Sequence, residues 1–404
     1  MIAAKTFRSR SLSSLLRVLC PLLLAAPLAL AFSGCATAGS SFIVDSDHLA
    51  MVLRSRNLEA EKPILPFELN EEMRRFAHET APVELPALEK LELLRSRLID
   101  PNQMKVKYSW GYTGTAEEVF VNREANCLAF TNLFVGLARE VGVKVFFLSV
   151  SNVENYRREG DLVLVSDHVA VGYGDSSTSL AVYDFSEHQE IDNSDRRFVK
   201  RISDLTAIAM FYSNRGAEAL RAGLDDSAVK WVHAAVLIDP ELANAWVNYG
   251  VTQRRVGDLE GAEQSYRKAI GLDPRIYSAY NNLASLLRQQ NRTEEAKAYE
   301  RELLKGPNQN PYTYLSLGDI SLRSGRYDEA GDFYRRAAGL STENSEALAA
   351  LGQLAVAKGD LRTAKKMLKK AQETHGSDLV SRVNRLADVI AATDRPEKIS
   401  RQSS

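Results

Sequence analysis

The sequence has few cysteines and histidines, the residues that build disulfide networks and most zinc centres. It contains three cysteines and six histidines in 404 residues. The histidines are scattered without ligand spacing, so we expect no metal and no other cofactor. No glycine-rich phosphate loop is present. Positive charge is not in excess either, because 51 Lys and Arg are balanced by 52 Asp and Glu, for a formal net charge of −1. Nucleic acid is therefore not an expected partner.

The overall composition is that of ordinary globular domains. Hydrophobic residues make up 45% of the chain and charged residues 25%, with 12 prolines and 23 glycines. These values exclude a mostly disordered chain, a collagen-like chain and a membrane protein with many spans. Since domains average about 150 residues, the length predicts two or three of them.

The first forty residues have the pattern of a targeting segment. Residues 1–17 carry four basic side chains and no acidic one, and the apolar run Val18–Phe32 is too short and too broken by proline to span a bilayer. The run ends in Phe-Ser-Gly-Cys, which resembles a bacterial lipobox. The resemblance implies a signal peptide over residues 1–34 and lipid attachment to Cys35. An ordinary signal peptide followed by an incidental cysteine is the alternative.

Lipid attachment would make the membrane a partner through the anchor. Ala36 resembles the residue that follows the lipidated cysteine in outer-membrane lipoproteins of Gram-negative bacteria, so we expect the periplasmic face of that membrane. Residues 35–45 would form the anchor and a small, polar tether. Removal of the signal peptide takes away four basic side chains and leaves a net charge of about −5. With Cys20 removed and Cys35 acylated, Cys127 is the only free thiol, and no intramolecular disulfide is possible.

The C-terminal half repeats itself every 34 residues. The pattern strongly resembles tetratricopeptide repeats, which implies five helix pairs over residues 209–378, with a capping helix and tail over 379–404. Small residues are expected where the two helices of a unit cross, and each unit is expected to bury its face only against its neighbours. The recurring small residues are Gly216, Gly250, Ala284, Gly318 and Gly352, and then Ala228, Ala262, Ala296, Ala330 and Ala364.

The resemblance to tetratricopeptide repeats also implies a concave groove lined by the first helix of each unit. Arginines at this density could hold an acidic segment or a free carboxylate through charge-assisted hydrogen bonds. We therefore expect a protein or peptide partner in the groove, and a merely solvated charged face is the alternative. The family's inward positions carry Arg221, Arg254, Arg255, Arg288 and Arg323.

Residues 46–205 carry no repeat and hold the candidate chemistry. Apolar residues follow Cys127 at helical spacing as far as Val141, and Gly142 ends this predicted helix. Cys127 lies in its first turn, where the positive end of the helix dipole favours the thiolate. Two further helices are predicted over 70–80, with Asn70 as N-cap, and over 85–98.

Short strands are predicted around this helix, over 105–110, 143–150, 168–173 and 180–185. A small, polar turn joins the last two. If that hairpin is centred on Ser176, His168 lies directly opposite Asp184, with Cβ atoms about 5 Å apart. The carboxylate would then orient the imidazole and fix its tautomer, as in a nucleophilic triad.

These residues carry a second resemblance. Asn126-Cys127, the helix over 133–142, Asp167-His168-Val169 and Tyr183-Asp184 resemble the transglutaminase-like superfamily, a branch of the papain-like Cys-His-Asp enzymes. The resemblance covers roughly residues 65–190. The fold class expected for the whole chain is thus an α+β transglutaminase-like domain over 46–205, followed by an all-α tetratricopeptide-repeat solenoid.

The second resemblance also implies roles for individual residues. It makes Cys127 the nucleophile, His168 the general base and acid, and Asp184 the group that orients His168. The backbone N–H of Cys127 is the default donor to an oxyanion, and Trp110 or Tyr108 are candidate side-chain donors.

Two functions stay open from the sequence. The first is a membrane-anchored periplasmic thiol enzyme that hydrolyses an amide or peptide, or transfers its acyl group as transglutaminases do, while the repeats recruit a partner or substrate. The second is a non-catalytic envelope scaffold in which the transglutaminase-like fold is inert and the repeats bind a partner. The order of Cys127, His168 and Asp184 favours the first.

Overall fold

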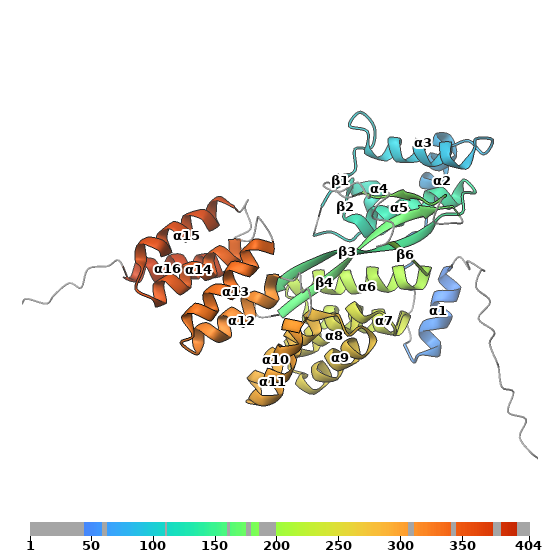
Figure 1. Cartoon of the computed structure of the whole chain (residues 1–404). Helices are drawn as coiled ribbons and strands as arrows, with labels where there is room; N and C mark the ends of the chain where they lie inside the picture. Colours follow the sequence, from blue (N-terminus) through green and yellow to red (C-terminus); the bar gives the residue numbers. More distant parts are fainter. Residues whose placement is uncertain are drawn as a thin grey trace, which may run out of the picture. The chain divides into compact units, whose positions relative to one another are not determined.

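The chain folds into an α+β part followed by a row of helix pairs (Figure 1). The computed structural model describes residues 44–58, 63–109, 111–159, 162–174, 179–185, 199–305, 311–340, 345–374 and 381–393, and within 151–167 and at 381 it describes the backbone alone. The predicted signal peptide over 1–34, the lipidation site Cys35 and the candidate Trp110 lie outside these residues. So do most of the tether and the end of the tail.

Among the residues that the structure describes, five helices belong to the α+β part. Two of them confirm predictions from the sequence, since α2 covers the predicted 70–80 segment and α3 the 85–98 segment. Asn70 caps α2 as expected, because its side chain accepts a hydrogen bond from the backbone N–H of Met73 at 3.0 Å. The helices are α1 (Ser46–Ser55), α2 (Glu71–Thr80), α3 (Ala87–Ile99), α4 (Ala116–Asn122) and α5 (Cys127–Glu140).

The strands in the described part of the chain form two sheets. A four-stranded antiparallel sheet has the order β5-β4-β3-β6, and β1 pairs in parallel with β2 in a small second sheet. Strands β3 and β4 are longer than predicted because their pairing continues beyond a register shift between Val150 and Glu154. The strands are β1 (Lys107–Tyr108), β2 (Glu124–Ala125), β3 (Phe146–Glu159), β4 (Leu162–Tyr173), β5 (Ala181–Tyr183) and β6 (Val199–Ile202).

Helix α5 is the centre of the α+β core. Its predicted apolar stripe, from Phe130 to Val141, is buried. The ring of Phe130 stacks on Phe185 with centroids 3.7 Å apart, which fixes the segment after β5 against the helix. Gly142 ends the helix as expected, at a φ of +81° that favours glycine.

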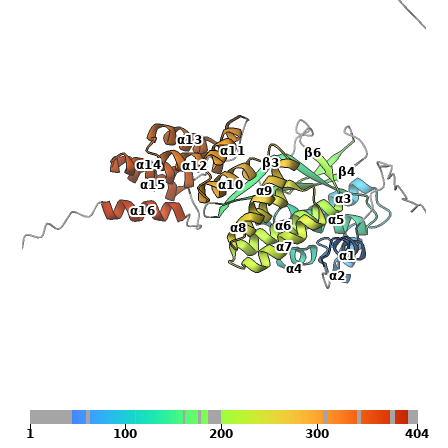
Figure 2. The same cartoon turned by 90° about the horizontal axis from the view of Figure 1, so that it is seen from below.

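The described residues of the C-terminal half form five helix pairs and a final helix (Figure 2). Each pair spans one of the 34-residue units, and the last helix lies within the segment expected to hold a capping helix. The pairs are α6 (Asp204–Arg221) with α7 (Asp225–Ile238), α8 (Ala243–Arg255) with α9 (Leu259–Leu272), α10 (Tyr277–Gln289) with α11 (Thr293–Lys305), α12 (Pro311–Arg323) with α13 (Tyr327–Leu340), and α14 (Ser345–Ala357) with α15 (Leu361–Glu373). Helix α16 (Ser381–Thr393) follows.

The recurring small residues lie where helices cross closely. A Cβ atom added at Gly250 would lie 2.6 Å from the ring of Tyr266, and one added at Gly318 would lie 2.3 Å from the ring of Tyr334. The recurring alanines are all fully buried. They are Ala228, Ala262, Ala296, Ala330 and Ala364. Tight helix crossing therefore explains the sequence period, as predicted.

The first helix pair shares its core with the α+β part. Buried side chains of α5, β3, α6 and α7 form one hydrophobic cluster. Arg139 of α5 makes two hydrogen bonds to the carboxylate of Asp204 in α6, at 2.8 and 2.9 Å. The expectation that every unit packs only against neighbouring units is thus wrong for this first pair, because its apolar side chains also complete the α+β core.

Candidate thiol site and repeat groove

Cys127 begins helix α5 at the centre of the candidate thiol site. The side chain of Asn126 caps the helix by accepting a hydrogen bond from the backbone N–H of Ala129 at 2.9 Å. Cys127 is a free thiol and is buried, with 4% of its surface exposed. Its place in the first turn exposes the sulfur to the positive end of the helix dipole.

The structure brings the three predicted triad residues together. His168 Nε2 lies 2.8 Å from Asp184 Oδ1, and the imidazole also shares a hydrogen bond with Cys127. Both the His168 and the Asp184 side chains are almost fully buried. The same Asp184 oxygen accepts a hydrogen bond from the backbone N–H of Phe185 at 2.7 Å, which holds the carboxylate in place.

The register of the hairpin differs from the predicted one. Val171 pairs with Tyr183, and Tyr173 with Ala181, so the pairing is displaced by two residues. The prediction that His168 lies directly opposite Asp184 is therefore wrong, and the two side chains meet as diagonal neighbours. Because a shift by two residues keeps every side chain on its own face of the sheet, the contact survives.

The surroundings of His168 favour its protonated form. Burial disfavours the charged imidazolium, but the hydrogen bonds to Asp184 and Cys127 outweigh it and raise the pKa of His168 to about 10. At neutral pH His168 is therefore an imidazolium, and its ring lies between the side chains of Asp184 and Cys127.

The segment that precedes α4 contacts the residues that lead into α5. Tyr108, a candidate oxyanion donor, lies in β1 opposite Ala125. The backbone N–H of Asn126 donates to the carbonyl of Tyr112 at 3.2 Å, and its side-chain amide donates to Thr113 Oγ1 at 2.6 Å. The roles of Asn126 and Thr113 were not predicted from the sequence. Asn before a helix is a capping signal that could have revealed the first, but nothing local reveals Thr113.

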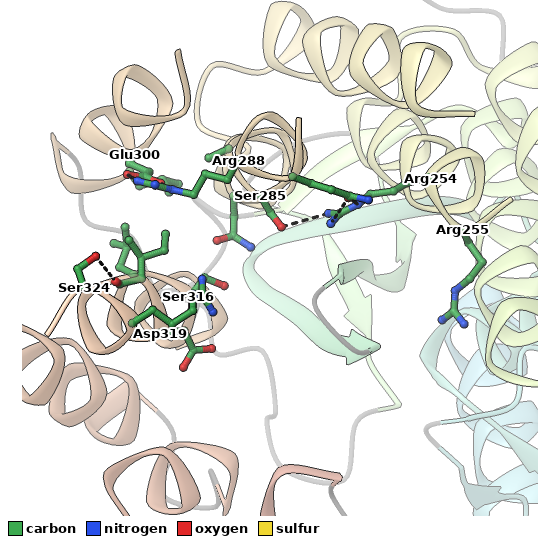
Figure 3. Close-up of a pocket in the computed structure, with 15 residues that line it drawn as sticks. Arg254, Arg255, Ser285, Arg288, Glu300, Ser316, Asp319 and Ser324 are labelled. Carbon is green, nitrogen blue, oxygen red and sulfur yellow. Dashed lines mark hydrogen bonds and ion pairs between the residues drawn. The ribbon is translucent and has the colours of Figure 1, made fainter. Parts of the chain in front are cut away.

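Four of the five predicted groove arginines line one cavity of about 680 Å³ between α8, α10 and α12 (Figure 3). Arg288 is paired with Glu300 at 2.5 and 2.7 Å, and Arg254 donates to Ser285 at 3.2 Å. Arg255 and Arg323 are exposed and make no hydrogen bond or ion pair within the described part of the chain. Two guanidinium groups at this cavity are therefore available to an outside acceptor.

Arg221 does not lie at the cavity. Its guanidinium donates to the carbonyl of Gly111 in the α+β part at 3.2 Å. The placement of Arg221 in the partner groove is thus corrected, because its helix α6 packs against the α+β part instead of lining open groove.

Strand β4 covers part of the inner face of the repeats. It contacts α8 and α10, which are the first helices of the second and third pairs. The inner surface that remains for another molecule includes the arginine cavity, whose wall extends from α10 to α12.

Metal-binding groups and helices that could span a membrane are both absent from the described residues. Among them, no group of three or more His, Cys, Asp or Glu side chains is placed to hold a metal ion. In the same part of the chain, no helix has the length and apolar character needed to cross a bilayer.

Comparisons with known proteins concern the repeats. Two family models described as "Tetratricopeptide repeat" match residues 250–312 and 321–386. The C-terminal half is an array of tetratricopeptide repeats. Such arrays present surfaces on which other proteins or peptides bind. No curated protein matches the chain.

Solved structures similar to the chain include other repeat proteins. A thermophilic tetratricopeptide-repeat protein from Thermus thermophilus is 20% identical over 46% of this chain and 97% of its own, with a TM-score of 0.40. PilF of Pseudomonas aeruginosa is 23% identical over 45% and 84%, with a TM-score of 0.36. PilW, described as a widely conserved type IV pilus biogenesis factor, is 22% identical over 46% and 85%, with a TM-score of 0.39.

Proposed function

We propose that this protein is a scaffold whose repeats bind an acidic protein segment or peptide in the arginine cavity. The exposed guanidiniums of Arg255 and Arg323 on the wall of that cavity carry the proposal. A guanidinium binds a carboxylate through two parallel hydrogen bonds, so these two side chains favour a partner rich in Asp or Glu. Arg288 is already neutralised by Glu300 and adds less attraction.

The binding proposal is tested with a fluorescein-labelled peptide of alternating Glu and Ser. Fluorescence anisotropy should show saturable binding that weakens with salt. The double variant Arg255→Gln/Arg323→Gln should weaken it about tenfold or more, whereas Arg275→Gln, an exposed arginine outside the cavity lining, should not. Equal binding by the double variant would contradict the proposal.

The scaffold would act in the cell envelope. The lipobox-like segment ending at Cys35 supports a lipid anchor, and Ala36 supports the periplasmic face of the outer membrane of a Gram-negative bacterium. Metabolic labelling with a palmitate analogue should mark the wild-type chain and not Cys35→Ser. Label retained by Cys35→Ser would contradict lipidation at this residue.

The α+β part supports a second function, thiol acyl transfer of the transglutaminase-like kind. The hydrogen-bonded row of Cys127, His168 and Asp184 favours it. In the first step the Cys127 thiolate forms a bond to an amide carbonyl carbon, the C–N bond breaks, and the leaving amine takes the proton of the His168 imidazolium. Asp184 holds Nε2, so Nδ1 is left to exchange this proton.

In the second step water resolves the thioester. His168 accepts one proton of the water, the oxygen bonds to the acyl carbon, and the C–S bond breaks to restore the thiolate and imidazolium. An amine in place of water would give transfer instead of hydrolysis. With p-nitrophenyl acetate as probe, we expect a burst of one p-nitrophenol per chain, carried by Cys127. A burst of the same size from Cys127→Ala would count against this function.

A further inference from the structure

The first helix of the repeats reaches into the neighbourhood of the thiol. Helix α6 holds the segment 111–113 through its charged side chains. Thr113 donates its backbone N–H to Glu218 Oε1 at 2.7 Å, and its carbonyl accepts from Arg215 at 3.4 Å. Both backbone polar groups of Thr113 are therefore committed to α6.

The side chain of Thr113 connects these contacts with α6 to the start of helix α5. Its hydroxyl accepts the 2.6 Å hydrogen bond from the side-chain amide of Asn126, and only 1% of Thr113 and 8% of Asn126 are exposed. The carbonyl oxygen of the Asn126 side chain faces the other way and caps the helix at Ala129. A single row of hydrogen bonds thus runs from Glu218 through Thr113 and Asn126 to the turn that carries Cys127.

The charged end of this row is unusual for a contact that serves packing alone. The Glu218 side chain is only 18% exposed, and burial raises its pKa, although the hydrogen bond from Thr113 opposes that rise. Removing a carboxylate from water is unfavourable unless its hydrogen bonds are well made. An apolar residue would hold two packed elements together without this penalty, whereas a directed hydrogen bond sets the position of Thr113.

We infer that Thr113 and Glu218 are positioning residues for Cys127, so that the first repeat is a working part of the thiol site. This inference rests on the thiol chemistry proposed above. Thr113 and Glu218 act through Asn126, which fixes where α5 begins and therefore where the Cys127 sulfur lies relative to His168. A partner that moves the first repeat would change the reactivity of the thiol.

The test compares alkylation of Cys127 by iodoacetamide between pH 5.5 and 9. The protein is the chain from residue 36 onward, which contains the compact unit 43–404 and has Cys127 as its only thiol. Thr113→Val removes the hydroxyl acceptor at nearly constant volume, and Thr113→Ser keeps it. We expect Thr113→Val to lower the rate at pH 6.5 about tenfold, and Thr113→Ser to stay within about twofold of the wild type.

A purely structural role would lower the thermal midpoint but leave the shape of the pH profile unchanged, and that result would overturn the inference. Should Thr113→Val lose its native circular dichroism, Glu218→Ala replaces it, with Glu260→Ala as the control on an exposed helix face.

The variant His168→Asn distinguishes failure of this inference from failure of the proposed thiol chemistry. If it leaves the wild-type profile unchanged, the thiol chemistry itself fails, whereas a profile that depends on His168 but not on Thr113 or Glu218 defeats only this inference.

Discussion

His168 lies on β4 and Asp184 directly follows β5, two register positions away from direct opposition, and their side chains still form a hydrogen bond of 2.8 Å. Since the hydrogen bonds of His168 raise its pKa to about 10 against the effect of burial, loss of the carboxylate should lower that pKa. We predict that Asp184→Asn moves the titration of the His168 ring toward 6.5, as followed by NMR of its ring resonances. An unchanged midpoint would mean that Asp184 does not hold the proton on His168.

The same interaction predicts how stability depends on pH. A group whose pKa is higher in the folded state stabilises the fold below its unfolded pKa of about 6.5, and this stabilisation is lost as the pH rises through the folded value. The contribution of His168 to the free energy of unfolding should therefore be complete below about pH 6.5 and fade toward pH 10. Urea unfolding at pH 6, 8 and 9.5 should show a steeper decline for the wild type than for His168→Asn. Parallel declines would refute the assignment.

The close crossing of helices in the repeats predicts that an added methyl group lowers stability at Gly318 but not at Gly339. Gly318→Ala places a methyl group 2.3 Å from the ring of Tyr334, so the crossing must open. We expect a loss of about 1–3 kcal/mol in the free energy of unfolding. Gly339→Ala, also on a helix but with nothing within 4 Å of the new methyl group, should be neutral or stabilising by up to about 1 kcal/mol. Equal effects in denaturant titrations would contradict the proposed packing.

The pair between Arg139 and Asp204 joins the α+β part to the first repeat. Its side chains are only 13% and 8% exposed. Arg139→Ala leaves a buried carboxylate without its partner, and we expect it to lower the free energy of unfolding by about 3–5 kcal/mol. The exposed pair of Arg275 and Asp273 is the comparison, for which Arg275→Ala should change less than about 1 kcal/mol. Similar small losses for both would show that the first repeat does not depend on this contact.

Periodicity and local signals predicted much of the fold from the sequence. The 34-residue spacing located the repeats, and the stripe after Cys127 located helix α5, because each depends on residues close together in the chain. The full length of β3 and β4 and the two-residue displacement at β5 were not predictable. Strand pairing is set by tertiary contacts as well as by the turn.

The main residues of the thiol site were predictable from the sequence, but their supporting contacts were not. Residue types and order placed Cys127, His168 and Asp184 together despite the wrong register. Arg221 was misplaced because a repeat pattern does not reveal that the first helix serves another domain. Thr113 was missed because its hydrogen-bond partners, Asn126 and Glu218, are distant in sequence and become its neighbours only in the fold.

Whether the α+β part adds chemistry to the scaffold is decided most directly by the rate at which iodoacetamide alkylates Cys127 at different pH values. In the wild-type chain from residue 36 onward, we predict a rate that stays within about threefold between pH 8 and pH 6, because the proposed triad pairs the reacting sulfur with the imidazolium of His168. His168→Asn should lose about tenfold in rate for each pH unit below about 8.5, as an ordinary thiol does. A wild-type rate that falls as steeply as that of His168→Asn would contradict a working triad.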